Sequence, residues 1–262
     1  MRKLVISALF TTLFTAGLAA QKSEAWSDWS RKDAEKILND SPWGQTQIET
    51  NTSEMTYSPT TGAAPGTGPR TTRPSTGVRE DQTNRNRNRA LEGAYNQAVS
   101  IDYQIRFLSS KPIREAFAKM ILLQQTGADP ENPNTERIKS QMQGFVDRNF
   151  SEYVVVAVNY EASDQRLAAK AFQEFGAAVT DTLKNNTYLE RTDGKRIFLM
   201  DYRAPVQDGL GARFVFARIV DGKPFLNGGS GEVRFYSEVG PNVKLNRRFK
   251  VSDMIYQGKL EY

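Results

Sequence analysis

The stretch RIFLMDYRA (196–204) is the first of four short runs in the C-terminal half that are rich in β-branched and aromatic residues. The other three runs are ARFVFARIV (212–220), GEVRFYSEV (231–239) and VKLNRRFKV (243–251). Gly, Pro, Asp or Asn residues separate them, as is typical of strands joined by turns. Consecutive strands connected in this way pair as a mainly antiparallel sheet.

The segments before these strands alternate between strand and helix patterns. VSIDYQIRFL (99–108) has apolar residues at every second position, and YVVVAVNY (153–160) is a continuous β-branched run, typical of a central strand. Helices are indicated by the periodicity of 111–125, which opens with a proline, by 134–148, and by a long stretch that ends at Leu183. The sequence therefore predicts one α+β domain over residues 90–262, with helices packed on a mainly antiparallel sheet.

The N-terminus reads MRKLVISALFTTLFTAGLAAQKSEAW, with Arg2 and Lys3 before an apolar run that ends at Phe14. Small residues follow, so the pattern is that of a secretory signal peptide over residues 1–20, with cleavage no later than residue 25. A membrane anchor is the alternative, but the apolar run is short for a span and contains two threonines. We expect export to the periplasm or the medium and no transmembrane span after cleavage.

Residues 26–44 indicate a short amphipathic helix with a tryptophan near each end. Ser30 is a suitable N-cap, and Asp33 stands where a capping box requires an acid. A helix this short is marginal alone in water, so its apolar face needs a surface to pack against. That surface is either the protein's own domain or a protein partner, and both alternatives stay open. The candidate docking residues are Trp26, Trp29, Ile37, Leu38 and Trp43.

A linker follows this helix, because residues 50–89 contain few apolar residues and many Thr, Pro, Gly and Asn residues. Such a composition cannot bury enough surface to offset its ordering entropy, so we predict disorder. Between Tyr57 and Arg89 there are six arginines against only Glu80 and Asp81. They indicate either a solvated basic linker or weak contact with a polyanion; no aromatic residues are interleaved for base stacking.

The chain of 262 residues contains no cysteine and no histidine. Disulfides, nucleophilic cysteines, and arrangements that need a histidine base are therefore excluded, and the usual transition-metal ligands are missing. We predict no cofactor and no metal site. An enzyme built from this chain would depend on carboxylates, Lys, Tyr or a Ser–Lys pair.

Carboxylates offer the one realistic catalytic arrangement, since a pair of acids hydrolyses glycosides without histidine. Glu161 and Asp164 follow the strand at 153–160, and Asp201 and Asp208 lie near the end of another strand. The alternative is structural, with Asp164 as a helix N-cap and Asp208 in a turn. These four residues are weak catalytic candidates.

Two further motifs carry alternative readings. The cluster Gly228-Gly229-Ser230-Gly231 lacks the Lys-Ser/Thr ending of a phosphate-binding loop and precedes a strand, so it indicates a flexible connection between strands. The basic strand 243–251 either presents charge to an acidic partner or protects a sheet edge from aggregation, and the second role is favoured.

The segments DWSRKDAEKILNDSPWG (28–44), IRFLSSKPIREA (105–116), YVVVAVNY (153–160) and RRFKVSDMIYQGKLEY (247–262) carry a resemblance that covers most of the chain outside the linker. The patterns WxxxDAxxILxxSPW and FxxxxMxYxGKLEY resemble those of an uncharacterised group of predicted secreted proteins from Acidobacteria and related environmental bacteria. The resemblance implies bacterial export, with a matching N-terminal helix and C-terminal strand. It transfers no catalytic residue and no ligand.

These observations favour an exported bacterial protein that serves as a non-enzymatic interaction or envelope-associated module. The absent catalytic residue types and the tryptophan-bracketed helix support this hypothesis. The alternative is a histidine-free, carboxylate-dependent hydrolase that acts on glycans.

Overall fold

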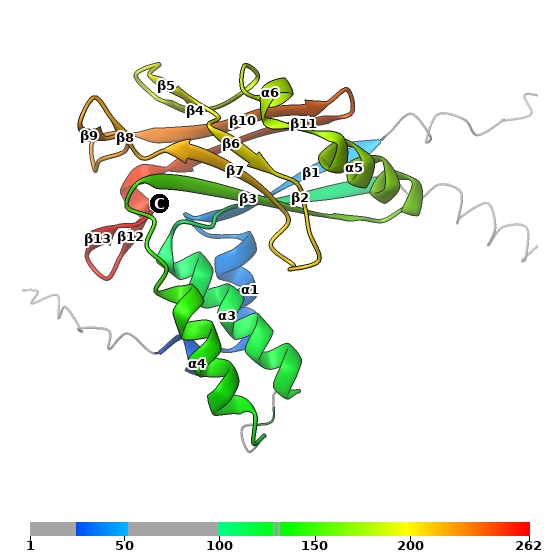
Figure 1. Cartoon of the computed structure of the whole chain (residues 1–262), viewed down its shortest axis with the longest axis vertical. Coiled ribbons are helices and arrows are strands. Elements are labelled where there is room, and N and C mark those ends of the chain that lie inside the picture. Colours follow the sequence, from blue (N-terminus) through cyan, green and yellow to red (C-terminus); the bar gives the residue numbers. More distant parts are fainter. Residues whose placement is uncertain (1–24, 52–98, 128, 130–131) are drawn as a thin grey trace, which may run out of the picture.

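The computed structural model describes residues 25–51, 99–127, 129 and 132–262. The predicted signal peptide and nearly all of the predicted linker lie outside the described residues. Within them, helices pack on mainly antiparallel sheets, so the predicted α+β class is confirmed (Figure 1).

The first sheet has five strands, and every neighbouring pair in it is antiparallel. Its spatial order is β1 (Gly44–Asn51), β2 (Val99–Phe107), β3 (Tyr153–Ala162), β7 (Ala212–Ala217) and β6 (Asp201–Arg203).

The second sheet has four antiparallel strands. Its order is β11 (Val243–Lys250), β10 (Glu232–Gly240), β4 (Thr187–Arg191) and β5 (Arg196–Phe198). Two short hairpins complete the strands: β8 (Ile219–Val220) with β9 (Lys223–Pro224), and β12 (Ile255–Tyr256) with β13 (Lys259–Leu260).

Aromatic side chains fill the space between the two sheets. The ring of Phe214 on β7 lies 5.3 Å from that of Phe235 on β10, and Phe107 on β2 lies 4.9 Å from Phe249 on β11. All four are fully buried. Rings crossing from one sheet to the other bury large apolar areas, so they hold the two layers together.

Helices lie in two places around this core (Figure 1). The helix α5 (Gln165–Ala177), followed by α6 (Thr180–Leu183), packs at one end of the sheets, where Phe175 stacks on Tyr160 at 5.5 Å. The remaining helices, α1 (Arg31–Asn39), α3 (Lys111–Thr126) and α4 (Thr135–Val146), form a group with the 3₁₀ turn η1 (Trp26–Asp28). A second 3₁₀ turn, η2 (Val251–Asp253), follows β11.

The N-terminal segment belongs to the same folded unit as the rest of the described chain. The predicted capping box of α1 is confirmed, since Ser30 Oγ accepts from the backbone of Asp33 and the Asp33 carboxylate accepts from the backbone of Ser30. After α1 the chain enters β1, which pairs with β2 over its whole length. A Cβ at Gly44 would lie 2.3 Å from the carbonyl oxygen of Leu38, so only glycine allows this close approach.

The structure corrects three sequence predictions. Residues 44–51 form a strand rather than the end of a helix and the start of a linker, because pairing with β2 overrides their polar composition. The helix expected to run to Leu183 breaks at Ala178 and Val179, which are extended. The run RIFLMDYRA is two strands in different sheets, because the chain crosses between the sheets at Leu199 and Met200.

Candidate functional site

A cavity of about 390 Å³ opens on the outer face of the five-stranded sheet, beside the loop between α4 and β3. Three arginines line it: Arg148 from the loop, Arg203 from β6 and Arg213 from β7. We call this cavity the arginine pocket.

Strand register explains why these side chains share one face. Val155 on β3 is opposite Val215 on β7, and Val215 is opposite Asp201 on β6. Two residues further along, Arg213 is opposite Arg203. Successive side chains of a strand point to opposite faces. Val155, Val215, Arg213 and Arg203 therefore line the pocket, and the residues that alternate with them point into the core.

The positive charges in the pocket are only partly balanced. Arg203 Nε lies 3.2 Å from Asp201, and Arg213 Nη1 lies 2.9 Å from Asp208. The Nε of Arg213 is fully buried and finds no hydrogen-bond partner among the described residues. Arg148 forms no ion pair within the described part of the chain. Like charges directly opposite on a sheet repel, so the pocket favours an anion.

The remaining wall of the pocket is largely apolar. Phe145 comes from the last turn of α4 and Phe150 from the loop after it, and Phe150 is held against the buried Arg114, whose guanidinium lies 5.0 Å from the ring centre. Tyr153 and Met200 stand at the pocket and keep 42% and 52% of their surface exposed. Arginines above an apolar floor are complementary to a small molecule with an apolar body and an anionic group.

The four candidate carboxylates do not form one acid pair. Glu161 lies exposed on β3 opposite Asp102 of β2, and Asp164 accepts from the backbone of Arg166 as the N-cap of α5. This hydrogen bond, with the Arg166 side chain, lowers the pKa of Asp164. The structural alternative for Asp164 is therefore confirmed.

The other two acids each pair with an arginine of the arginine pocket, Asp201 with Arg203 and Asp208 with Arg213. Asp201 is in the pocket wall and also accepts from Thr180 Oγ1 at 3.3 Å. Asp208 accepts from the backbone of Leu210 at 3.0 Å, which is the turn role that the sequence offers as the alternative. Each of these carboxylates is held by an arginine, so neither is a free base in this structure.

The tryptophan-bracketed segment packs on the chain's own domain. Trp26 and Trp43 are each 8% exposed; the indole of Trp26 donates to Gln143 on α4, and that of Trp43 donates to the carbonyl of Glu261. Leu38 is 5% exposed, and Trp29 and Ile37 are half-buried against the core. Of the two docking alternatives, the structure shows the intramolecular one for Trp26, Leu38 and Trp43.

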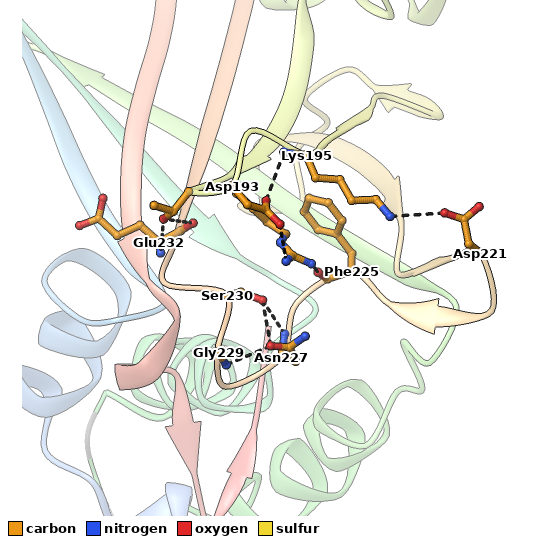
Figure 2. A network of polar contacts seen from close by, with 10 residues as sticks. Asp193, Lys195, Asp221, Phe225, Asn227, Gly229, Ser230 and Glu232 are labelled. Atoms are coloured by element: carbon orange, nitrogen blue, oxygen red, sulfur yellow. Dashed lines mark hydrogen bonds and ion pairs between the residues drawn. The ribbon is translucent and has the colours of Figure 1, made fainter.

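The glycine-rich cluster is a self-bonded connection between β9 and β10. Figure 2 shows Asn227, Gly229 and Ser230 bonded to one another, with the Asn227 side chain accepting from the backbone of Gly229 at 2.9 Å. The Ser230 hydroxyl accepts from the backbone of Asn227, and Glu232 donates its backbone N–H to Thr192. These N–H groups are already used within the loop and its neighbour Thr192, as expected of a connection between strands.

The basic strand β11 forms an edge of the four-stranded sheet, and its cations have partners. Lys244 pairs with Glu238 at 3.0 Å, Arg248 with Glu232 at 3.5 Å and Lys250 with Asp253 at 3.1 Å. Arg247 points inward and donates to the carbonyl of Thr46 on β1.

Within residues 25–51, 99–127, 129 and 132–262, no group of three or more Asp and Glu side chains is placed to hold a metal ion. None of the described helices combines the length and the hydropathy that a membrane span requires.

No family model, curated protein or solved structure matches this chain.

Sequence reasoning missed all three arginines of the pocket. A signal was present for two of them, because Arg203 and Arg213 occupy outward positions between the inward residues Tyr202, Ala212 and Phe214. The pairing of β6 with β7, which makes them neighbours, is not contained in either strand alone.

Proposed function

We propose that this chain is an exported, non-enzymatic binding protein that holds a small amphipathic anion in the arginine pocket. The ligand has a carboxylate, sulfonate or phosphate group and an apolar body. The observation that carries the proposal is the incomplete pairing of Arg148 and Arg213 above an apolar wall. Anionic groups bind most strongly to guanidinium groups that lack other partners.

Several features support binding rather than catalysis. The chain has no histidine and no cysteine, and the two carboxylates near the pocket are engaged by arginines. Glycan hydrolysis needs one carboxyl group that protonates the leaving group, and none of the four candidate acids stands unpaired in the pocket. Export is supported by the N-terminal sequence pattern and by the resemblance to predicted secreted proteins.

The anion-binding proposal is tested with two fluorescent probes of similar apolar body. Anilinonaphthalene sulfonate carries an anionic group, and N-phenyl-1-naphthylamine lacks it. We expect the full-length chain to bind the sulfonate saturably and at least about tenfold more tightly than the neutral amine, because loss of one charge-assisted hydrogen bond costs about 1.5–3 kcal/mol.

Variants then locate the probe. Arg148→Met is expected to weaken sulfonate binding by about tenfold. Arg137→Met is the matched control, since Arg137 is exposed on α4 and its side chain hydrogen-bonds, among the described residues, only to Asn134 and Gln141. Equal affinities for the two probes, or equal effects of the two substitutions, would refute the proposed function.

A further inference from the structure

A second cavity, of about 310 Å³, lies at the end of the molecule where β1 and β2 approach α5 and the β10–β11 turn (Figure 1). Its polar lining includes Glu49, Tyr103, Lys170 and Asn242, and its apolar lining includes Ile101 and Leu167. None of the arginine-pocket residues lines it, so the two cavities are independent.

The cavity begins where the contact between β1 and β11 ends. The side chain of Gln47 bridges these strands: its Nε2 donates to the carbonyl of Lys244, and its Oε1 accepts from the backbone of Asn246, both at 2.8 Å. Two residues further along β1, Glu49 lies on the same inner face, beside Ile101. In the described part of the chain, no hydrogen bond joins Glu49 to β11, and the space there stays open.

Two polar groups in this cavity lack full partners. Tyr103 is only 2% exposed, yet its hydroxyl makes no hydrogen bond to any other described residue. The Glu49 carboxylate accepts from Gln47 Nε2 at 2.8 Å but takes part in no ion pair among residues 25–51, 99–127, 129 and 132–262. A buried phenol and a half-buried carboxylate in this state favour a ligand that donates hydrogen bonds.

The local electrostatic potential also favours a positively charged ligand. Burial raises the pKa of Glu49. The pKa of Tyr103 is raised above its ordinary value first by burial and then by the negative charges of Glu49 and Glu174. A positive charge placed between Glu49 and Tyr103 would relieve both effects.

We infer that this cavity binds a small organic cation, a primary amine with a compact apolar body. Its ammonium group donates to the Glu49 carboxylate and to the hydroxyl oxygen of Tyr103. Its apolar part contacts Ile101 and Leu167. The site goes beyond the proposed anion pocket and does not depend on it.

The charge of Lys170 is expected to affect the affinity for a cation in the opposite direction to the charge of Glu49. Its side chain lines the cavity and belongs to an exposed residue of α5, so its charge opposes a bound cation but is screened by water. Removing Glu49's charge is therefore expected to weaken binding, whereas removing the charge of Lys170 is expected to strengthen it.

The test uses isothermal titration calorimetry of the full-length chain with three ligands of similar size: cyclohexylammonium, cyclohexanol and cyclohexanecarboxylate. We expect binding of the ammonium ion at millimolar concentration or below and much weaker binding of the other two. Glu49→Gln is expected to reduce the ammonium affinity about tenfold and Tyr103→Phe about threefold, whereas Lys170→Met raises it about twofold. N-acetyl-lysine amide, tested in parallel, distinguishes a free amine from the lysine side chain of a polypeptide.

Three results would overturn the inference. They are an absence of ammonium binding at millimolar concentration, unchanged affinity in Glu49→Gln, and tighter binding of the carboxylate that is lost in Lys170→Met. Circular dichroism checks that the near-isosteric Glu49→Gln and Tyr103→Phe variants are folded. The arginine-pocket variant Arg148→Met serves as a control that leaves ammonium binding unchanged, so the two proposals fail separately.

Discussion

The outer faces of the two sheets both carry arginines, and they use them differently. On the four-stranded sheet, Glu190 accepts from Arg196 at 2.6 Å and from Arg234 at 3.2 Å. The same guanidinium groups lie over the rings of Tyr188 and Tyr236, at 4.5 Å and 5.0 Å from the ring centres. Every one of these cations has both an acidic and an aromatic neighbour.

On the five-stranded sheet the balance is incomplete. Arg203 and Arg213 stand directly opposite each other with one aspartate each, and Arg148 has no ion pair in the described chain. The rings of Phe145 and Phe150 line the same cavity. Arginine and aromatic residues on a sheet face therefore do not by themselves indicate a binding site. What distinguishes the arginine pocket is the shortage of partners inside a concave surface.

The largest effect is expected from a substitution in the core between the two sheets. Phe214 is fully buried between Tyr202 and Phe235, with ring centres 5.1 Å and 5.3 Å away. Phe214→Ala is expected to lower the free energy of unfolding by about 3–5 kcal/mol, because it leaves a cavity between the sheets. Urea denaturation followed by circular dichroism measures the change.

The control for this substitution is Phe172→Ala on α5, where the side chain is 67% exposed. Its effect is expected to stay within about 0.5 kcal/mol. A loss below about 1 kcal/mol in Phe214→Ala would show that the two sheets do not depend on each other for stability.

The second prediction separates the two faces. Arg213→Met is expected to weaken binding of anilinonaphthalene sulfonate by about tenfold, because it removes a guanidinium that lines the pocket and is paired with a single aspartate. Arg234→Met is expected to leave this affinity unchanged, because Arg234 lies on the other sheet and is already bonded to Glu190 and Asn246. Fluorescence titration of both variants decides the matter. Similar losses of affinity in both variants would mean that the probe does not distinguish the arginine pocket from the outer face of the four-stranded sheet.

The sequence allowed much of the fold to be predicted, since alternation and turn residues depend on local chemistry. β10 and β11 lie within one residue of the expected runs, and β3 begins where expected and ends two residues later. β1 was not predictable in this way, because GQTQIETN is polar and its strand conformation comes from pairing with β2.

The site was less accessible to sequence reasoning, for a physical reason. The arginine pocket combines β6, β7 and a loop more than fifty residues earlier, and only strand pairing brings them together. In the second cavity, likewise, the β1–β2 register brings Glu49 and Tyr103 to the same lining. The tryptophan pattern correctly marked a segment that must bury its apolar face, but the partner is the chain's own α3 and α4, which the pattern itself does not specify.

The smallest effect is expected on the outer face of the four-stranded sheet, where Glu190 pairs with two arginines. Hydrogen bonds and charge from Arg196 first, and then from Arg234, hold the pKa of Glu190 below its ordinary value. A carboxyl group with a lowered pKa in the folded state stabilises the fold above its unfolded pKa, and this contribution is lost as the pH falls through the folded-state pKa.

Glu190→Gln is therefore expected to lower the free energy of unfolding by only about 0.5 kcal/mol at neutral pH, because water and salt screen the exposed Arg196. The difference from the unsubstituted chain should shrink as the pH falls below the ordinary Glu pKa of about 4.3, and it should disappear once the pH is below the lowered folded-state pKa. Urea denaturation at neutral and acidic pH measures it, with Glu136→Gln on the exposed face of α4 as the control. A difference that persisted at acidic pH would mean that the shape of the side chain, rather than its charge, matters on this face.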